Sequence, residues 1–474
     1  MSGQFPRAVH RGNGIIGLVP MWKPVLPRDA KQPVFRVLLQ AIADDITSGK
    51  LTPGTRLPPH RDLADDLVIA RGTVARAYLE AEKLGLVRGE VGRGTIVLAP
   101  DKGERAYSSL LEAPTVQKDF STNLPLSGID PAPASALRAL AERPDRSALL
   151  RYLPPQGATR HRMAGVQWLR RLDVEARVED VLLCAGAQHA LFVIFSHLAR
   201  HTRTVYVEEL TYPGVHGLAE ALDLTLVPVG TNAEGMDVGD LARAVRRHGP
   251  GVVYCMPTIH NPTGAVMSEA QRRQLAAIAQ REDLFIVEDA ASRMLDASPP
   301  PPVIAFAPER TFFVASVSKI LLPGLRVAFV VGPKAHMAAL SRLVWASQWM
   351  VGALGAELVS MWLEDGVVDR TAMSKRRAAK RRQAIASRAL TGCGKIVAHP
   401  SALHVWLTLA NSWNAERFAH TAAKRRIVVT PSSAFWSRPT PPPRAIRISL
   451  GGVDHTRALR EGLEAIATLA RAAR

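Results

Sequence analysis

The sequence has little of what an exported, disulfide-stapled or membrane-spanning protein needs. Its 474 residues include three cysteines, Cys184, Cys255 and Cys393, with no C-x-x-C pair. We therefore expect neither a disulfide framework nor a metal site, and a reducing cytoplasm fits best. No apolar run approaches the roughly 20 residues that cross a bilayer. The opening MSGQFPRAVHRGNG lacks the apolar core of a signal peptide, so export is not expected.

Acidic residues are also in deficit. Lys and Arg number 60 against 42 Asp and Glu, a net charge of +18, while 47% apolar residues exclude a largely disordered chain. A positive field attracts polyanions, most often nucleic acid, although membranes and acidic ligands stay possible. The densest basic runs, at 375–377, 380–382 and 424–426, are expected to be solvated helix faces.

Residues 33–99 have the pattern of a small separate domain. Apolar residues at four-residue spacing predict a first helix around 38–46. A short helix over about 61–67, a tight turn and a longer helix over about 71–84 follow. Two strand-like runs around the glycine-bearing tip 89–94 predict a hairpin. This order is that of a winged helix-turn-helix.

In a helix-turn-helix the second helix enters the major groove, and its first residues reach the base edges. Arg71, Thr73 and Arg76 lie where that helix is expected to begin. Arg61 is placed for a backbone phosphate, and Arg93 at the hairpin tip for the minor groove. A helical domain that binds protein is the alternative.

The run GKLTPGTRLPPHRDLADDLVIARGTVARAYLEAEKLGLV resembles the DNA-binding domain of the GntR family. It departs at Ala81 or Glu82, where that family has a leucine, which affects packing rather than a contact. The matching positions are Gly49, Leu51, Gly54, Leu57, Pro58, Arg61, Leu63, Ala64, Arg71, Thr73, Val74, Tyr78 and Gly85.

Beyond an expected linker at 100–120, residues 121–474 alternate short apolar runs with longer helical stretches. Strands without polar alternation imply a sheet buried on both faces, so we expect an α/β domain with a mostly parallel sheet. A smaller α+β part is expected over about 375–474. The expected strands are 181–184, 204–207, 224–229, 252–256, 284–288, 311–315 and 326–331, then 404–409, 427–430 and 445–450.

Several reactive or phosphate-binding groups follow these strands, at the edge where open α/β sheets bind ligands. Lys319, in Ser316-Val-Ser318-Lys319, can form an imine with an aldehyde if its site lowers its pKa. Arg326, seven residues later, suits a phosphate. The run Gly186-Ala187-Gln188 opens a helix whose N–H groups can hold a phosphate.

Two further strand ends complete the set. Asp289 can pair with a protonated pyridine nitrogen, and Asn261, in an Asn-Pro-Thr-Gly turn, can hydrogen-bond a phenolic oxygen. Aldehyde, pyridine, phenolic oxygen and phosphate together specify pyridoxal 5'-phosphate. Each motif alone is more often structural, and their joint order carries the prediction.

At these residues the chain resembles fold-type I aminotransferases. The resemblance implies that Tyr212 stacks on the pyridine ring and that Tyr152 reaches the phosphate across a dimer interface. It implies that Arg447 binds a substrate carboxylate. Core packing for the tyrosines and a surface charge for Arg447 are the alternatives. That family usually has a tyrosine two or three residues after the aspartate, but here Asp289 is followed by Ala-Ala-Ser, which puts transamination in doubt.

A GntR-type reader joined to an aminotransferase-like domain resembles the MocR (GabR-like) regulators of bacterial transcription. The resemblance implies a head-to-tail homodimer that binds operator DNA. An amino compound reacting at the aldimine of Lys319 would alter that binding, a switch between two states. The alternative is a working pyridoxal-phosphate aminotransferase with an accessory N-terminal domain.

Overall fold

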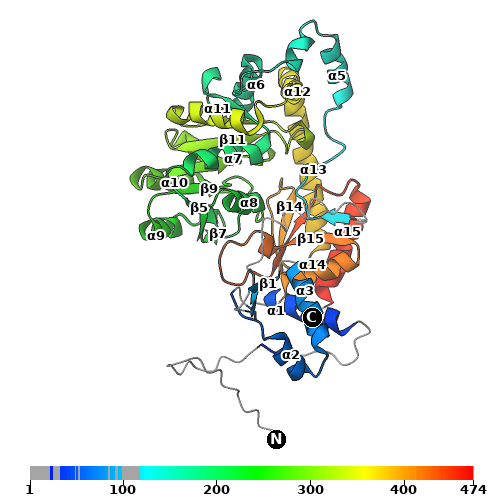
Figure 1. The fold of residues 1–474 in the computed structure, drawn as a ribbon. Coiled ribbons are helices and arrows are strands. Elements are labelled where there is room, and N and C mark those ends of the chain that lie inside the picture. The colour runs from blue at the N-terminus through cyan, green and yellow to red at the C-terminus, as the bar shows by residue number, and fades with distance from the viewer. Residues whose placement is uncertain are drawn as a thin grey trace. The chain divides into compact units, whose positions relative to one another are not determined.

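A computed structural model describes residues 22–24, 33–47, 50–51, 54–83, 86–90, 94–98, 118–410 and 413–472. The chain divides into two compact units, Met1–Asp101 and Lys102–Arg474 (Figure 1). Within the described residues, no helix combines the length and apolar character that crossing a bilayer requires. All three cysteines are buried.

The first unit is a winged helix-turn-helix, as predicted. Its helices pack around buried apolar residues that lie four apart on the first and third helices, Leu38 with Ile42 and Val74 with Tyr78, and around Leu63 on the second. Between the second and third helices, Val68 adopts a left-handed conformation (φ 55°) that turns the chain sharply. The elements are α1 (Val34–Thr47), α2 (His60–Leu67), α3 (Arg71–Lys83) and the antiparallel strands β1 (Val87–Glu90) and β2 (Gly94–Val97).

The second unit is built on a seven-stranded sheet in the order β4-β12-β11-β10-β9-β5-β6. All neighbouring strands pair in parallel except β12, which is antiparallel to β4 and β11. The predicted, mostly parallel α/β sheet is therefore confirmed. The strands are β4 (Leu182–Cys184), β5 (Thr204–Glu208), β6 (Thr225–Val229), β9 (Val252–Cys255), β10 (Phe285–Asp289), β11 (Thr311–Ser316) and β12 (Ala328–Val331).

Helices cover both faces of this sheet, which is why its strands are apolar without alternation. One face packs against α7 (Gly186–Leu198), α8 (Pro213–Ala221) and α11 (Lys334–Gln348). The other packs against α6 (Thr159–Arg170), α9 (Val238–His248), α10 (Glu269–Arg281) and α12 (Ala353–Glu364).

The smaller part of this unit has a five-stranded sheet in the order β13-β14-β16-β15-β3. Its first strand in the chain, β3 (Lys118–Phe120), pairs in parallel with β15, so the last three residues of the segment expected to be a linker form part of this sheet. The other elements are β13 (Gly394–Val397), β14 (His404–Leu409), β15 (Ile427–Pro431), β16 (Ala445–Ser449), α13 (Val367–Ala389), α14 (Ala415–Lys424) and α15 (Thr456–Arg471).

Shorter elements connect these layers. A helix, α5, precedes α6, and a two-stranded ribbon precedes α9. They are α5 (Pro133–Glu142), β7 (Thr231–Asn232), β8 (Gly235–Met236) and the 3-10 helices η1 (Arg146–Leu150), η2 (Val178–Asp180), η3 (Arg293–Leu295), η4 (Val303–Ala305), η5 (Pro323–Leu325) and η6 (Ser432–Ala434).

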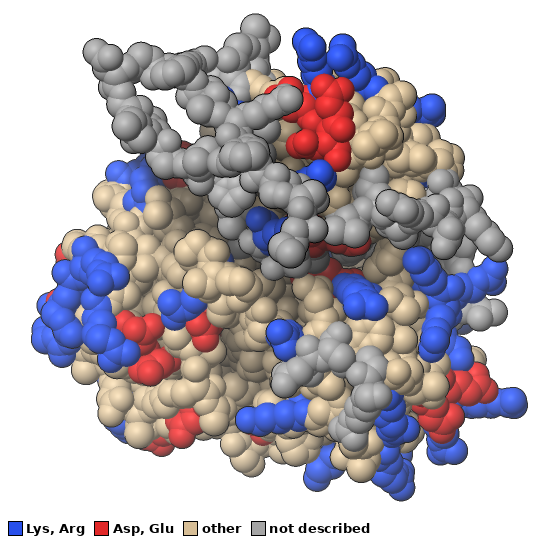
Figure 2. All heavy atoms as spheres, turned by 90° about the horizontal axis from the view of Figure 1, so that it is seen from below, with Lys and Arg blue, Asp and Glu red and all other residues tan. Residues whose placement is uncertain are grey.

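The basic runs do not all face solvent, which corrects the sequence-based expectation. Lys375 on α13 is fully buried and pairs with Asp130 (Nζ–Oδ1 2.5 Å). Arg382 on the same helix is 6% exposed and donates hydrogen bonds to the carbonyl oxygens of Leu450 and Val453. On the face shown in Figure 2 the blue basic atoms form several separate groups, with acidic atoms beside some of them. Part of the positive charge is therefore carried by buried side chains and does not lie on the surface.

Candidate functional site

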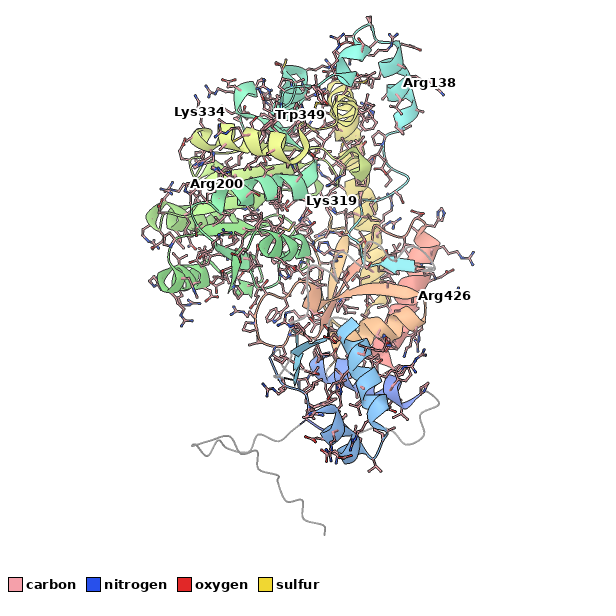
Figure 3. All side chains as sticks on the ribbon, in the orientation of Figure 1. Arg138, Arg200, Lys319, Lys334, Trp349 and Arg426 are labelled. Carbon is pink, nitrogen blue, oxygen red and sulfur yellow. The ribbon has the colours of Figure 1, made fainter. Side chains whose placement is uncertain are left out.

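Lys319 lies in the turn after β11, inside the second unit, whereas Lys334 lies at the edge of the ribbon (Figure 3). The Nζ atom of Lys319 donates a hydrogen bond to the carbonyl oxygen of Asn123. Burial and the nearby charge of Arg447 lower the pKa of Lys319 to about 8. A larger fraction of the amine is then neutral at pH 7, the form that attacks an aldehyde. Nothing in the sequence singles out Asn123, because it contributes a backbone carbonyl.

Asp289 ends β10 and is 3% exposed. Its Oδ1 accepts a hydrogen bond from the backbone N–H of Ala291 (3.0 Å), and its Oδ2 accepts one from the hydroxyl of Tyr254 (3.0 Å). Burial raises the pKa of Asp289, while these two donors and the charge of Lys319 oppose that rise. The arrangement holds a carboxylate ready for a positively charged donor. Tyr254 was missed from the sequence, although it lies in the predicted strand 252–256.

Gly186 and Arg326 meet where β4 leads into α7. Gly186 has φ +80°, and a Cβ at this position would lie 2.5 Å from Nη2 of Arg326. Arg326 itself is left-handed (φ 52°), and its Nη2 donates to the carbonyl oxygen of Ala185 (3.2 Å). The strand expected at 326–331 begins only at Ala328, so Arg326 lies in the turn before it. A guanidinium thus lies against the first residue of a helix, the combination that binds phosphate.

The neighbouring polar groups are close to this corner. Ala187 and Gln188 complete the first three residues of α7, whose N–H groups lack partners within the helix. The Oε1 atom of Gln188 is buried without a hydrogen-bond partner among the described residues. On the strand that leads to Lys319, the hydroxyl oxygens of Ser316 and Ser318 lie 2.9 Å apart. The N–H groups of α7 and the two serine hydroxyls offer further donors to a phosphate, whereas the Gln188 Oε1 can only accept a hydrogen bond.

Tyr212 caps the N-terminus of α8, next to Gln188. The Nε2 atom of Gln188 donates to the carbonyl oxygen of Gly214 (3.0 Å), and a Cβ on Gly214 would collide with both the Tyr212 ring and Gln188. Burial and the charge of Asp289 raise the pKa of Tyr212. The hydroxyl of Tyr212 therefore keeps its proton at neutral pH.

Arg447 and Asn261 are joined directly. Nη1 of Arg447 donates to Oδ1 of Asn261 (2.8 Å), and Nη2 donates to the carbonyl oxygen of Ser121 and to Oγ1 of Thr430 (3.3 Å). Arg447 is 6% exposed, so it is not the surface charge of the alternative interpretation. Burial lowers its pKa to about 10. Ser121 and Thr430 had no sequence signal, since both contacts depend on tertiary structure.

Tyr152 is not gathered with these residues. It is 80% exposed, which excludes core packing within this chain, and its ring lies 5.1 Å from that of Trp349. Leu150, Trp345 and Trp349 are exposed as well, at 77%, 51% and 48%. The apolar surface formed by these four residues is called the Tyr152 face below.

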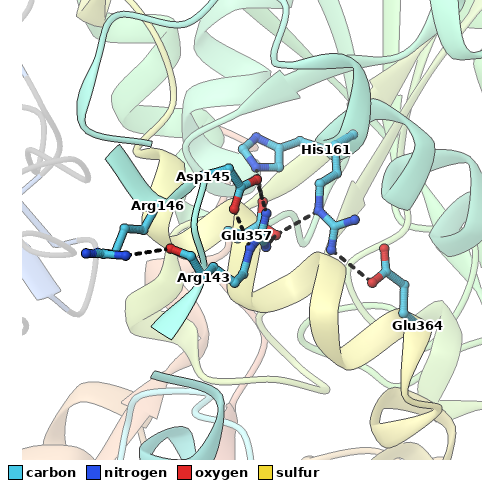
Figure 4. A network of polar contacts seen from close by, with 7 residues as sticks. Arg143, Asp145, Arg146, His161, Glu357 and Glu364 are labelled. Carbon is cyan, nitrogen blue, oxygen red and sulfur yellow. Dashed lines mark hydrogen bonds and ion pairs between the residues drawn. The ribbon is translucent and has the colours of Figure 1, made fainter. Parts of the chain in front are cut away.

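A charged cluster fixes the segment that leads to this face (Figure 4). Glu357 on α12 is fully buried and contacts Arg143, Arg160 (2.7 Å) and His161 (2.9 Å). Burial alone would raise the pKa of Glu357, but the hydrogen bonds from His161 and the two arginines lower it to about 2. Arg143 also holds Asp145 (2.6 Å), at the start of η1.

In the first unit, the predicted DNA contacts mostly face solvent. Arg61 on α2 and Arg71, the first residue of α3, are exposed, while Thr73 is half-buried. Arg76 is exposed too, and its guanidinium stacks 4.1 Å above the ring of Phe35. Arg93 lies outside the described residues.

Comparison with known proteins gives two matches that divide the chain in the same way. Residues 116–466 match the family described as aminotransferase class I and II, and residues 36–97 match the bacterial regulatory proteins of the gntR family. The chain belongs to the aminotransferase class I and II family. It carries a GntR helix-turn-helix domain ahead of the aminotransferase domain, which is the organisation of the MocR-like regulators that the sequence resembles.

Two relatives align with this chain over nearly their whole length. The chain is 28% identical to YdeF, an uncharacterized HTH-type transcriptional regulator of Bacillus subtilis, over 93% of this chain and 95% of YdeF. It is 29% identical to PtsJ, the vitamin B6 salvage pathway transcriptional repressor of Salmonella typhimurium, over 88% of this chain and 94% of PtsJ.

A solved structure confirms the fold of the second unit. LysN, the α-aminoadipate aminotransferase of Thermus thermophilus, complexed with N-(5'-phosphopyridoxyl)-L-leucine, aligns with a TM-score of 0.70 at 23% identity. The alignment covers 78% of this chain and 97% of LysN. The predicted fold-type I aminotransferase architecture is therefore confirmed.

Proposed function

We propose that this protein is a transcription regulator that binds operator DNA through residues 33–99 and holds pyridoxal 5'-phosphate at Lys319. An amino compound that takes the place of Lys319 on the cofactor's aldehyde carbon, and so releases the lysine amine, alters the affinity for DNA. The observation that carries the proposal is a buried lysine of lowered pKa in an aminotransferase domain that follows a GntR helix-turn-helix. A regulator that acts on operator DNA works in the cytoplasm.

The residues present fit this cofactor. Gly186 lets the Arg326 guanidinium lie against the start of α7, where any Cβ would meet it, and Asp289 offers a held carboxylate to a ring nitrogen. Gln188 has a buried oxygen without a partner among the described residues. When bound, the cofactor supplies an aldehyde that bonds covalently to an amine. The groups proposed to hold it are Lys319, Asp289, Asn261, Arg326, Ser316, Ser318, Tyr212, Gly186, Ala187, Gln188 and, from a second subunit, Tyr152.

Arg447 indicates the class of effector. It is buried, its hydrogen bonds go to neutral oxygens, and no ion pair between described residues includes it. A buried guanidinium without an anion is costly, and a carboxylate that reaches it makes a charge-assisted bidentate bond. We propose that the effector carries a carboxylate as well as an amine.

A second copy of the chain is the proposed occupant of the Tyr152 face. Clustered, exposed aromatic side chains are typical of subunit interfaces. The Glu357 cluster makes the presenting segment rigid, which reduces the entropy lost on association. Sedimentation of the full chain should give a dimer, and replacing Tyr152 and Trp349 by serine should shift it to the monomer.

The test of the function compares two lysine variants. Operator DNA is first selected from random duplexes with the wild-type protein. Lys319→Ala should lose the visible absorption band of the bound cofactor and the response of DNA binding to amino acids. Lys334→Ala, which removes an exposed lysine on α11, should change neither. A band that persists in Lys319→Ala, or an effector response without the cofactor, would refute the proposal.

A working aminotransferase is the alternative. Those enzymes usually have a tyrosine two or three residues after the aspartate, but here Ala291 and Ser292 hold these positions, and Ser292 is 4% exposed. This position therefore lacks the tyrosine hydroxyl that would hold the cofactor's phenolic oxygen. Turnover of an amino donor with a keto acid, without retardation of any DNA, would favour the enzyme.

A further inference from the structure

The carboxylate of Asp289 is held by hydrogen bonds rather than by a cation. Its Oδ1 accepts from the N–H of Ala291 (3.0 Å), and its Oδ2 accepts from the hydroxyl of Tyr254 (3.0 Å). None of the ion pairs between described residues includes Asp289. Of the two donors, the N–H is fixed by the backbone, so the hydroxyl is the one that a side-chain substitution can remove.

The sheet places Tyr254 for this contact. β9 and β10 are parallel neighbours, with Tyr254 opposite Val287, two residues before Asp289. Side chains two residues apart on a strand share a face, so Tyr254 and Asp289 point to the same side of the sheet. An aromatic side chain reaches the diagonal neighbour on the next strand, which brings the hydroxyl to the carboxylate at the strand end.

Packing fixes the ring as well. Tyr254 is fully buried, and its centroid lies 6.3 Å from that of Phe195 on α7. A ring clamped in this way keeps its hydroxyl in one place, so the hydrogen bond fixes the orientation of the Asp289 carboxylate as well as its charge state.

We propose that Tyr254 is a positioning residue that orients the Asp289 carboxylate toward the ring nitrogen of the bound cofactor. The inference rests on the proposed function, because the cofactor supplies that nitrogen. A hydrogen bond donated to a carboxylate favours its charged form, the form that accepts an N–H. Burial acts the other way and raises the pKa of Asp289. The Tyr254 hydroxyl therefore offsets part of the effect of burial.

The experiment compares two tyrosines that each lose one buried hydroxyl. Tyr254→Phe removes the contact with Asp289. Tyr206→Phe is the matched control, because Tyr206 is fully buried on β5, beside β9, and its hydroxyl donates to the carbonyl oxygen of Gly249 (2.5 Å). Pyridoxal 5'-phosphate is titrated into each cofactor-free full-length protein, followed by absorption, and thermal unfolding is recorded on the same samples.

Loss of a hydrogen bond to a charged group should weaken the cofactor affinity of Tyr254→Phe by about tenfold or more. The pH dependence of its absorption band should shift, while Tyr206→Phe keeps the wild-type affinity and spectrum. With the carbocyclic analogue, in which CH replaces the ring nitrogen, Tyr254→Phe and wild type should bind alike. A merely structural tyrosine would weaken both ligands equally.

The outcomes separate the two proposals. If the wild-type protein binds no pyridoxal 5'-phosphate, the proposed function fails and the role of Tyr254 fails with it. If the wild type binds and Tyr254→Phe matches it in affinity and spectrum, only the positioning role is overturned. An equal loss in Tyr206→Phe, or an equal loss with the carbocyclic analogue, overturns it too.

Discussion

Replacing Gly186 by alanine should weaken the proposed phosphate site and, to a somewhat smaller extent, the stability of the fold. Gly186 has φ +80°, and a Cβ there would lie 2.5 Å from Nη2 and 2.7 Å from Cζ of Arg326. The guanidinium has to move, and its hydrogen bond to the carbonyl oxygen of Ala185 is lost with that movement. The substitution thus acts on Arg326 through space, without removing any side chain.

Two costs can be separated. A left-handed conformation costs an L-residue roughly 1–2 kcal/mol, which appears as reduced stability. Losing a hydrogen bond from a guanidinium to a phosphate costs about 1.5–3 kcal/mol, which appears as reduced affinity. Since about 1.4 kcal/mol is tenfold, the affinity of Gly186→Ala for pyridoxal 5'-phosphate should fall by about tenfold to a hundredfold.

The assay is a titration of the cofactor-free protein with pyridoxal 5'-phosphate, paired with urea unfolding. Gly217→Ala is the control, because Gly217 lies in α8 and a Cβ there meets nothing within 4 Å. It should leave affinity unchanged. Pyridoxal without the phosphate should bind Gly186→Ala and wild type alike. An unchanged affinity for the phosphate ester, or an equal loss for both ligands, would show that Gly186 and Arg326 do not hold the phosphate.

Three further substitutions test other parts of the molecule. Glu357→Gln should lower the free energy of unfolding at pH 7 by roughly 3 kcal/mol. Because the folded state lowers the pKa of Glu357 from 4.5 to about 2, the difference in stability between the variant and wild type should narrow as the pH falls from about 5 toward 2. Urea unfolding measures this difference, and a difference that does not change with pH would contradict the prediction. Lys375→Ala should lower the free energy of unfolding by about 3–5 kcal/mol, because it leaves Asp130 without its ion-pair partner. Lys380→Ala, at an exposed position on the same helix, should lower it by less than about 0.5 kcal/mol. Equal losses of stability would show that burial of Lys375 does not matter. Arg71→Ala should cost about 1–3 kcal/mol on the selected operator in fluorescence anisotropy, and an equal loss on random DNA would mean that Arg71 only neutralises phosphate.

The strands of the large sheet could be predicted because each one depends on the apolar character of a short stretch of sequence. Each strand is a short apolar run and helices separate most of them, and the observed strands differ from the predicted ones by one or two residues at their ends. β3 and β13 were missed. β3 has three residues, and β13 is largely exposed at the edge of its sheet, so neither has a pattern that stands out from a loop.

Burial of charge was the part of the fold that the sequence could not reveal. Lys375 and Arg382 lie in a run of basic residues that looks like a solvated helix face. Their partners are distant in sequence, Asp130 for Lys375 and the carbonyl of Leu450 for Arg382. Only tertiary structure tells which turn of a long helix faces such partners and which faces water.

The site itself was predictable to the extent that it sits at strand ends. Parallel strands end at one edge, so residues after them are brought together whatever the loops do. Tyr254 escaped notice because its role depends on the order of the strands, which pairs β9 with β10. Asn123 and Ser121 act through backbone carbonyls, which every residue has, so no side-chain pattern could single them out.

The electrostatics of the site link effector binding to the reactivity of Lys319. Arg447 is one of the charges that lower the pKa of Lys319 to about 8, and no ion pair between described residues neutralises it. An effector carboxylate that binds Arg447 cancels that charge and so raises the pKa of Lys319. The amine then holds its proton more firmly once the effector is in place. Removing the guanidinium with Arg447→Leu should raise the pKa of Lys319 in the cofactor-free protein, measured by the pH dependence of its reaction with an aldehyde. In this variant, adding a carboxylate should not change the pKa of Lys319 further. If the substitution leaves the pKa of Lys319 unchanged, Arg447 does not couple effector binding to the reactivity of the lysine.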